Sequence, residues 1–268
     1  MGAKNRYVQL IEAVFFASYR PGMTKVEFRR TDLERHARKL KIPLPKNLGD
    51  IIYSFRYRSD FPKRIREAAP PGKEWTILPA GRGQYVFVAE TLTDLGPNPS
   101  LLQIKVPDAT PGIITLYALT DEQSLLAKIR YNRLLDLFTR LVCYSLQSHL
   151  RTAVPDLGQL ETDEVYIGVD REGGHYVIPV QAKGPRDRLG VVQVQQDMAM
   201  CARKFPALTC RSVGAQFLAE DVIALLEFCA TPEGLRIAAE RHYYLVPPDK
   251  FTDEDLQRYR SLAQSTDG

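Results

Sequence analysis

The chain is poor in the residues that build disulfide frameworks and zinc sites. Its four cysteines and four histidines are spread over 268 residues, and no two cysteines form a CxxC pair. This scatter argues against a disulfide framework and against a zinc hydrolase. We expect the cysteines to be reduced and mostly buried thiols.

Long apolar runs are also missing. No stretch approaches the roughly 18 apolar residues of a transmembrane helix, and the N-terminus lacks the small-residue cleavage site of a signal peptide. We therefore expect a cytoplasmic protein with no membrane partner. Hydrophobic residues make up 44% of the chain and charged residues 25%, as in a globular protein of one large domain or two ordinary ones.

The charges are unevenly distributed along the chain. Residues 1–90 contain 18 Lys/Arg and 9 Asp/Glu, a net of +9, whereas residues 91–268 contain 18 and 23, a net of −5. A basic part joined to an acidic part indicates one half that binds a polyanion and another that gathers carboxylates. The alternative is that the basic residues only solubilise the first domain.

The basic part has the pattern of three helices followed by a β-hairpin. The predicted helices cover 5–18, 31–42 and 47–58, and the predicted strands cover 74–80 and 83–90. Asn47 is a plausible N-cap of the third helix. This is the order of a winged helix-turn-helix, whose third helix enters the major groove while the hairpin tip touches the neighbouring backbone. Protein–protein modules also show this order.

We therefore predict a winged-helix DNA-binding domain over residues 1–91, with double-stranded DNA as its partner. The side chains expected to contact DNA lie on or near the third helix and at the hairpin tip: Lys46, Asn47, Arg56, Arg58 and Arg82.

The second part is predicted as an α/β domain over residues 113–268, after a proline-rich linker at 92–112. We expect a long helix at about 121–149, strands from 159 to 184, a helix over 187–205, and strand-like runs at 208–218 and 221–230. These elements favour a mixed central sheet flanked by helices.

Polar side chains stand on two neighbouring strands of this domain. Alternation places Glu161 and Asp163 on one face of the first strand and Gln181 and Lys183 on one face of the second. Cleavage of a phosphodiester with Mg²⁺ needs oxygen ligands for the ion, and a lysine can orient the attacking water or stabilise the transition state. The set therefore indicates a metal-dependent nuclease site.

The strand with Asp163, the turn, the strand with Gln181-Ala182-Lys183 and the flanking helices resemble the PD-(D/E)xK nuclease superfamily. The Gln-x-Lys variant is similar to that of Mrr-type modification-dependent endonucleases. The resemblance implies a restriction-endonuclease-like core in which Asp163 is the central metal ligand. Gln181 and the Ala182 carbonyl would give further oxygens to the metal ion, and Lys183 would be the catalytic lysine.

The chain departs from the common family pattern in two places. Gln181 stands where an Asp or Glu is usual, and Thr162 replaces the proline before the acid. The family often adds an acid from the preceding helix, for which both Glu122 and Asp136 remain candidates.

These observations lead to the expectation of a Mg²⁺-dependent, restriction-type DNA endonuclease. A homodimer is the expected assembly, because cutting both strands usually calls for two active sites. The alternatives are a DNA-binding regulator with an inactive nuclease-like core and a nuclease for branched DNA or RNA. These residues could also have no catalytic role. Lys183 would then be a strand-end lysine that reaches water, Gln181 would be an edge-strand residue, and Glu161 would belong to a surface ion pair.

Overall fold

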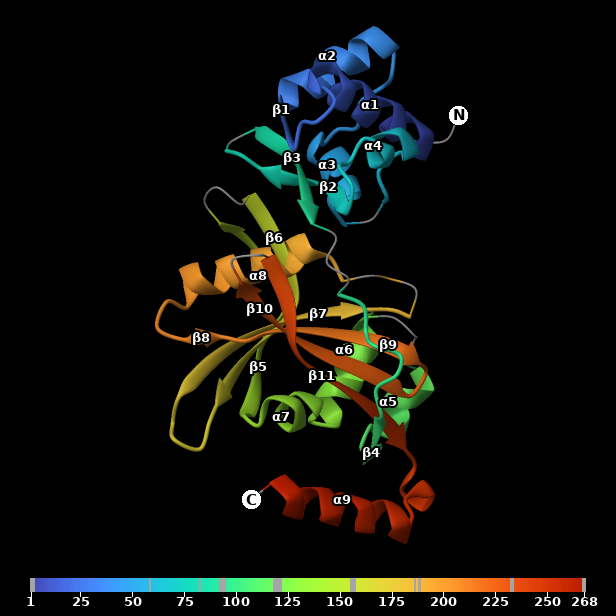
Figure 1. The fold of residues 1–268 in the computed structure, drawn as a ribbon, viewed down its shortest axis with the longest axis vertical. Helices are drawn as coiled ribbons and strands as arrows, with labels where there is room; N and C mark the ends of the chain where they lie inside the picture. The colour runs from blue at the N-terminus through green and yellow to red at the C-terminus, as the bar shows by residue number, and fades with distance from the viewer. Residues whose placement is uncertain are drawn as a thin grey trace. The chain divides into compact units, whose positions relative to one another are not determined.

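The computed structural model describes residues 3–57, 59–81, 83–91, 95–117, 122–154, 158–185, 187, 189–231 and 234–266 (Figure 1). The chain divides into two compact units, residues 1–94 with 151–160 and residues 95–150 with 161–268. The structure describes an α/β protein with a small antiparallel sheet near the N-terminus and a larger mixed sheet after it.

The N-terminal unit combines four helices with a three-stranded antiparallel sheet of order β1-β3-β2. Its elements are α1 (Ala3–Ser18), β1 (Lys25–Arg29), α2 (Arg30–Leu40), α3 (Gly49–Tyr57), α4 (Lys63–Glu67), β2 (Lys73–Pro79) and β3 (Gln84–Thr91). The three predicted helices and the hairpin are confirmed, whereas β1 and α4 were not predicted. β1 is short, and its burial alternates, with Val26 and Phe28 inward between exposed charged residues.

Aromatic side chains form the centre of this unit. Phe15 of α1 is fully buried, and its ring centroid lies 5.0 Å from those of Trp75 on β2 and Phe87 on β3. Edge-to-face pairs of this kind stabilise a core by about 0.5–1.5 kcal/mol each beyond the area that they bury. These contacts hold α1 against the sheet.

The C-terminal unit contains an eight-stranded sheet. Its helices are α5 (Gly112–Tyr117), α6 (Glu122–Tyr131), α7 (Leu134–Thr139), α8 (Val191–Lys204), the short η1 (Pro248–Lys250) and α9 (Asp253–Thr266). Its strands are β4 (Gln103–Pro107), β5 (Val142–Val154), β6 (Gly158–Val169), β7 (His175–Lys183), β8 (Thr209–Cys210), β9 (Ser212–Ala219), β10 (Val222–Thr231) and β11 (Gly234–Val246). The sheet order is β4-β11-β10-β9-β7-β6-β5, and β8 pairs with β7. β4 falls within the segment predicted as a linker.

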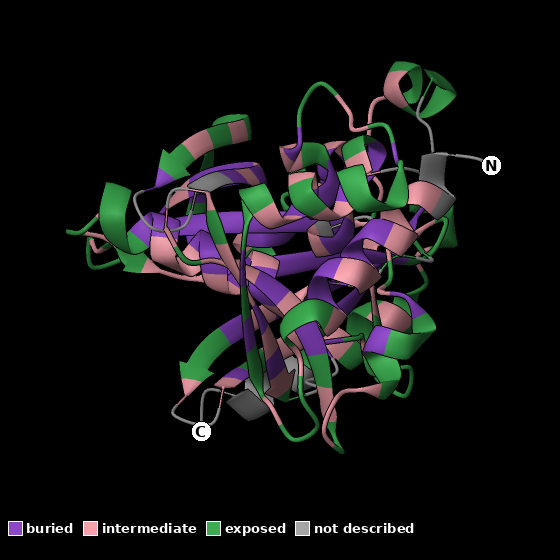
Figure 2. Ribbon diagram, turned by 90° about the horizontal axis from the view of Figure 1, so that it is seen from above, coloured by how far each residue is buried: buried purple, intermediate pink, exposed green. Residues whose placement is uncertain are grey.

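Helices cover both faces of this sheet. On β10, Ile223 and Leu225 pack in the cluster that includes α6 and α7, whereas Ala224 and Leu226 pack with α8 on the opposite face. Figure 2 shows the buried residues concentrated along the strands. The continuous apolar run of β10 is therefore typical of a strand buried on both faces.

The expectation of one long helix over 121–149 is wrong. α6 ends near Tyr131, α7 ends at Thr139, and residues 142–154 form β5. Arg133 and Arg140 adopt left-handed backbone conformations, with φ of 50° and 57°, and these interrupt the helix. Non-glycine residues rarely adopt positive φ, and a glycine or proline would normally mark such a break. Neither residue type occurs here, so the two breaks could not be predicted from the sequence.

The register of the central strands places the predicted site. β6 and β7 are antiparallel with Glu164 opposite Val180, and β7 runs parallel to β9 with Gln181 beside Gly214. Parallel neighbours need a long crossover connection, and α8 lies in this one. No helix within the described ranges is long and apolar enough to cross a membrane.

Candidate active site

Asp163 lies where β6 and β7 separate. The antiparallel pairing of the two strands ends at Glu164 and Val180, and beyond it the Ala182 backbone N–H donates to Asp163 Oδ2 at 2.8 Å. A side chain thus satisfies a backbone donor that the neighbouring strand no longer reaches. This bond fixes the Asp163 carboxyl against the strand that carries Gln181 and Lys183.

Alternation along β7 separates core residues from site residues. Val180 and Ala182 are fully buried in the cluster beneath α6 and α7. Gln181 points to the other face, where it contacts α8, and Lys183 is the last residue of the strand. Lys183 is half-buried, and its Nζ makes no hydrogen bond or ion pair with the residues that the structure describes. The ammonium is thus available to a ligand.

Asp197 of α8 contacts Gln181 from the face of the sheet that α8 covers. It is 1% exposed, its Oδ1 accepts the Thr162 hydroxyl at 2.5 Å, and its Oδ2 accepts Gln181 Nε2 at 2.8 Å. Burial raises the pKa of Asp197 to about 7, although the hydrogen bonds from Thr162 and Gln181 oppose this shift. No role for Asp197 was predicted from the sequence. Its signal was a lone acid in the apolar stripe of α8.

Burial and neighbouring charges act together on the Asp163 carboxyl. Burial raises the pKa of Asp163, whereas the Ala182 N–H, Lys183 and His149 lower it and Glu122 raises it. Of the two helix acids left open by the sequence, Glu122 at the start of α6 therefore lies within electrostatic range of Asp163. Asp136 instead pairs with Arg133 and accepts the Cys143 N–H at 3.0 Å.

Glu161 and His149 border the site. Glu161 Oε1 lies 3.9 Å from His149 Nδ1, and the Glu161 carbonyl accepts Gln181 Nε2 at 3.2 Å. His149 has a φ of 48° within β5, and its Nε2 lies 2.8 Å from the Gln123 amide nitrogen of α6. Chain segments from α6, β5, β6 and β7 therefore converge around Asp163.

The donors around Asp163 fit a magnesium ion that keeps several of its waters. In proteins Mg²⁺ is usually held by one or two carboxylates and otherwise by water and substrate oxygens. The described residues contain no cluster of three His, Cys, Asp or Glu side chains able to hold an ion by themselves. Asp163 is a desolvated carboxyl, and the Gln181 amide presents its oxygen away from Asp197 because its nitrogen donates there.

The residues predicted to contact DNA differ in their surroundings. Lys46 is exposed, Arg56 is half-buried, and Arg58 and Arg82 lie outside the described residues. Asn47 is exposed but engaged locally, because its Oδ1 accepts the Gly49 N–H at 3.1 Å and its Nδ2 donates to Asp50 at 2.8 Å. Asn47 therefore caps α3, as the sequence predicted.

A second basic surface lies on α2. Arg35, Arg38 and Lys39 are exposed on the side of the helix opposite the buried Leu33 and Ala37. Burial, together with the nearby Arg35 and Lys39, lowers the pKa of His36. These residues were not predicted as DNA contacts, because basic side chains in the last turn of a helix also interact favourably with the helix dipole.

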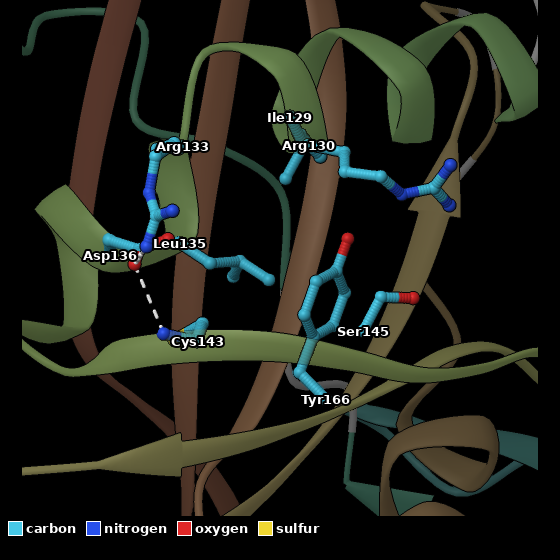
Figure 3. Close-up of a pocket in the computed structure, with 8 residues that line it drawn as sticks. All are labelled: Ile129, Arg130, Arg133, Leu135, Asp136, Cys143, Ser145 and Tyr166. Atoms are coloured by element: carbon cyan, nitrogen blue, oxygen red, sulfur yellow. Dashed lines mark hydrogen bonds and ion pairs between the residues drawn. The ribbon is translucent and has the colours of Figure 1, made fainter.

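A separate cavity of about 110 Å³ lies between β5–β6 and the helices α6 and α7 (Figure 3). Tyr166 points its hydroxyl into this cavity, and burial raises its pKa. Beside it, the fully buried Glu164 accepts hydrogen bonds of 2.6 Å from Arg130 and from Ser145. The Arg130 cation is thus neutralised by a protein carboxylate. Asp136, one of the two candidate helix acids, lines this cavity, whereas Glu161, Asp163, Gln181 and Lys183 are not among its lining residues.

A scan against protein-family models found no matching family, and searches of curated proteins and of solved structures found no match. The functional interpretation therefore depends on the geometry around Asp163.

Proposed function

We propose that the protein is a Mg²⁺-dependent endonuclease that hydrolyses phosphodiester bonds of duplex DNA, a hydrolase of the restriction or defence type. The observation that carries this proposal is the meeting of Asp163, Gln181 and Lys183 where β6 and β7 separate. A carboxylate fixed by a strand amide, a second oxygen donor and an ammonium available to a ligand are the groups that phosphodiester hydrolysis requires.

The order of elements supports the resemblance to the PD-(D/E)xK superfamily. The helices α6 and α7 precede the antiparallel strands β6 and β7, and α8 then leads to β9, parallel to β7. A helix, an acid-bearing strand, a turn, a Gln-x-Lys strand and a second helix thus occur in the expected sequence. We infer a restriction-endonuclease-like core for the C-terminal unit on this basis, and the chemistry follows from the side chains of the site.

Each residue of the proposed site has a separate role. Asp163, the Gln181 amide oxygen and the Ala182 carbonyl would hold Mg²⁺, which when bound makes a coordinated water more acidic and neutralises charge on the phosphate. Lys183 donates hydrogen bonds to the attacking water or to a phosphate oxygen, where its charge stabilises the transition state. Glu161 lies beside Asp163 and can accept a proton from water directed by Lys183.

The N-terminal unit is proposed as a winged-helix module for duplex DNA in the cytoplasm. Residues 1–90 carry a net charge of +9, which favours contacts with the phosphate backbone, and such contacts give an affinity that falls steeply with salt. Lys46, Arg56, Arg58 and Arg82 remain candidates from the sequence, and Arg35, Arg38 and Lys39 join them from the structure. Two copies of the chain would be needed to cut both strands with one site each.

The proposal is tested by incubating the purified protein with one sequence presented as duplex DNA, branched DNA, single-stranded DNA and RNA. We expect Mg²⁺-dependent fragments from duplex DNA that disappear with EDTA. Fragments from branched DNA or RNA alone would replace the restriction-type assignment with the other nuclease.

One observation favours a regulator with an inactive core as the second candidate. Gln181 stands where the resembled family usually has an acid, so the described residues form no cluster of three His, Cys, Asp or Glu side chains there. Titration of Mg²⁺ into wild type and Asp163→Asn separates the two functions. A nuclease shows binding that is lost in the variant, whereas an inactive core shows none in either protein while duplex binding persists.

A further inference from the structure

The Gln181–Asp197 pair fixes which way an ambiguous side chain points. An amide can present either its oxygen or its nitrogen to a neighbour, and only its hydrogen-bond partners decide between them. Gln181 Nε2 has two acceptors, Asp197 Oδ2 at 2.8 Å and the Glu161 carbonyl at 3.2 Å. Gln181 Oε1 must then point away from both.

The surroundings of Asp197 make this arrangement rigid. Gln181 and Asp197 are 2% and 1% exposed, so water cannot substitute for a missing partner. The second oxygen of Asp197 is held by the Thr162 hydroxyl at 2.5 Å. Thr162 directly precedes Asp163, and Gln181 lies two residues before Lys183. The carboxyl of Asp197 thus joins both strands of the site to α8.

We propose that Asp197 is a positioning residue that orients the Gln181 amide so that its oxygen, not its nitrogen, faces the proposed metal and substrate. This inference rests on the proposed nuclease function for its consequence but on the hydrogen bonds alone for its geometry. Position 181, where the resembled family usually has an acid, carries an amide here. The acid Asp197 on α8 accepts a hydrogen bond from that amide. The Gln181 amide and the Asp197 carboxyl together connect β7 to α8.

The pairing predicts which substitutions are compatible with each other. Gln181→Glu places a carboxylate 2.8 Å from the Asp197 carboxylate, and above about pH 7, where both are ionised, the two repel. In Gln181→Glu/Asp197→Asn, the new Asn amide donates to Glu and its oxygen still accepts the Thr162 hydroxyl. Only the weaker bond to the Glu161 carbonyl is removed. Asp197→Asn alone is tolerated, because the Thr162 hydroxyl can donate or accept.

The experiment is a double-mutant cycle at positions 181 and 197, with Asp197→Ala as the variant that removes the acceptor. Urea unfolding in EDTA should give lowered midpoints for Gln181→Glu and Asp197→Ala, and recovery for Gln181→Glu/Asp197→Asn. The wild-type Gln181 side-chain amide should show a slowly exchanging, downfield-shifted proton in ¹⁵N NMR spectra. This signal should persist in Asp197→Asn and disappear in Asp197→Ala.

Cleavage of duplex DNA provides the functional readout, measured at a temperature where every variant is folded. Asp197→Ala should lower kcat by about 10²-fold, the effect of displacing a reacting group by about 1 Å, with KM for DNA unchanged. The swapped double variant should recover most of the loss in Gln181→Glu. Wild-type kcat in folded Asp197→Ala, or no recovery in the double variant, overturns the positioning role.

Failure of the proposed function can be distinguished from failure of this inference. If wild type cuts no substrate, the nuclease assignment fails, and the unfolding cycle and the amide spectrum alone decide the geometry. Non-additive midpoints then support the orientation by Asp197. Additive midpoints with an unshifted amide proton contradict it.

Discussion

Gln181 Nε2 and Asp197 Oδ2 lie 2.8 Å apart, and this bond joins the central strand β7 to the helix α8 that covers it. Both residues are buried, so the bond forms away from water and leaves few alternatives for either group. Asp197 also binds Thr162, the residue before Asp163. The arrangement of the proposed site thus depends on a helix residue that belongs to neither strand.

Thr162→Val should destabilise the fold. The substitution keeps the shape of the side chain but removes the hydroxyl that donates to Asp197, which leaves a buried carboxyl oxygen without that partner. We expect a loss of about 1–3 kcal/mol in the free energy of unfolding, measured by urea denaturation. Thr162→Ser retains the hydroxyl and serves as the control. Equal stability of Thr162→Val and wild type would show that the bond contributes nothing.

Stability should fall as pH rises toward neutrality, because of Asp197. Burial raises its pKa from the ordinary 3.8 to about 7, so between these values the folded state binds more protons than the unfolded state. This contribution to stability is fully present below about pH 4 and is lost as pH passes 7. Unfolding measured in EDTA from pH 5 to 8 should show a shallower decline for Asp197→Asn. Parallel curves for both proteins would contradict the shift.

Some features of this site follow from the sequence, and others do not. The period of two along β7 correctly separated Val180 and Ala182 in the core from Gln181, which contacts α8, because a strand alternates its faces regardless of its partners. Asp197 lies on α8, within the crossover connection between β7 and β9. No local spacing rule relates that helix to β7, so its contact with Gln181 could not be predicted.

The failed helix over 121–149 has a different cause. Its residues have the composition of a helix, and the breaks at Arg133 and Arg140 depend on left-handed backbone conformations. Tertiary contacts act at such points against local preference. Arg211, which is distant in the sequence, donates at 2.8 Å to the carbonyl of Thr139, the residue before Arg140. The one sequence signal for β5 was the placement of large apolar side chains at every second position, Val142, Tyr144 and Leu146. All three are exposed in the structure.

Substitutions at two neighbouring positions should have different effects, with Asn47→Ala changing the stability of the fold and Lys46→Ala changing the affinity for duplex DNA. Asn47 caps α3, so Asn47→Ala should lower the free energy of unfolding by about 1 kcal/mol. Lys46 is exposed, so Lys46→Ala should leave stability unchanged and weaken duplex binding, with the salt slope reduced by about 0.9 if it contacts a phosphate. Fluorescence anisotropy at several salt concentrations measures the slope. An unchanged slope removes Lys46 from the interface.

The outer face of α2 should contribute to DNA affinity. Arg35→Glu/Arg38→Glu reverses two exposed charges there, so we expect weaker duplex binding and a salt slope reduced by about 0.9 for each phosphate that the variant no longer binds. Arg258→Glu/Arg260→Glu makes the same charge change on α9 and is the matched control. If both double variants bind equally well, α2 is an ordinary solvated helix face.

Lys183 provides the most direct test of the nuclease assignment. The measurement is the single-turnover rate of plasmid cleavage with Mg²⁺ for wild type, Lys183→Ala and Lys204→Ala, the last an exposed lysine at the end of α8. We expect cleavage by wild type and Lys204→Ala, loss of about 10²-fold or more in Lys183→Ala, and none in EDTA. Equal rates in all three proteins, or no cutting by folded wild type that still binds duplex DNA, would contradict catalysis at this site.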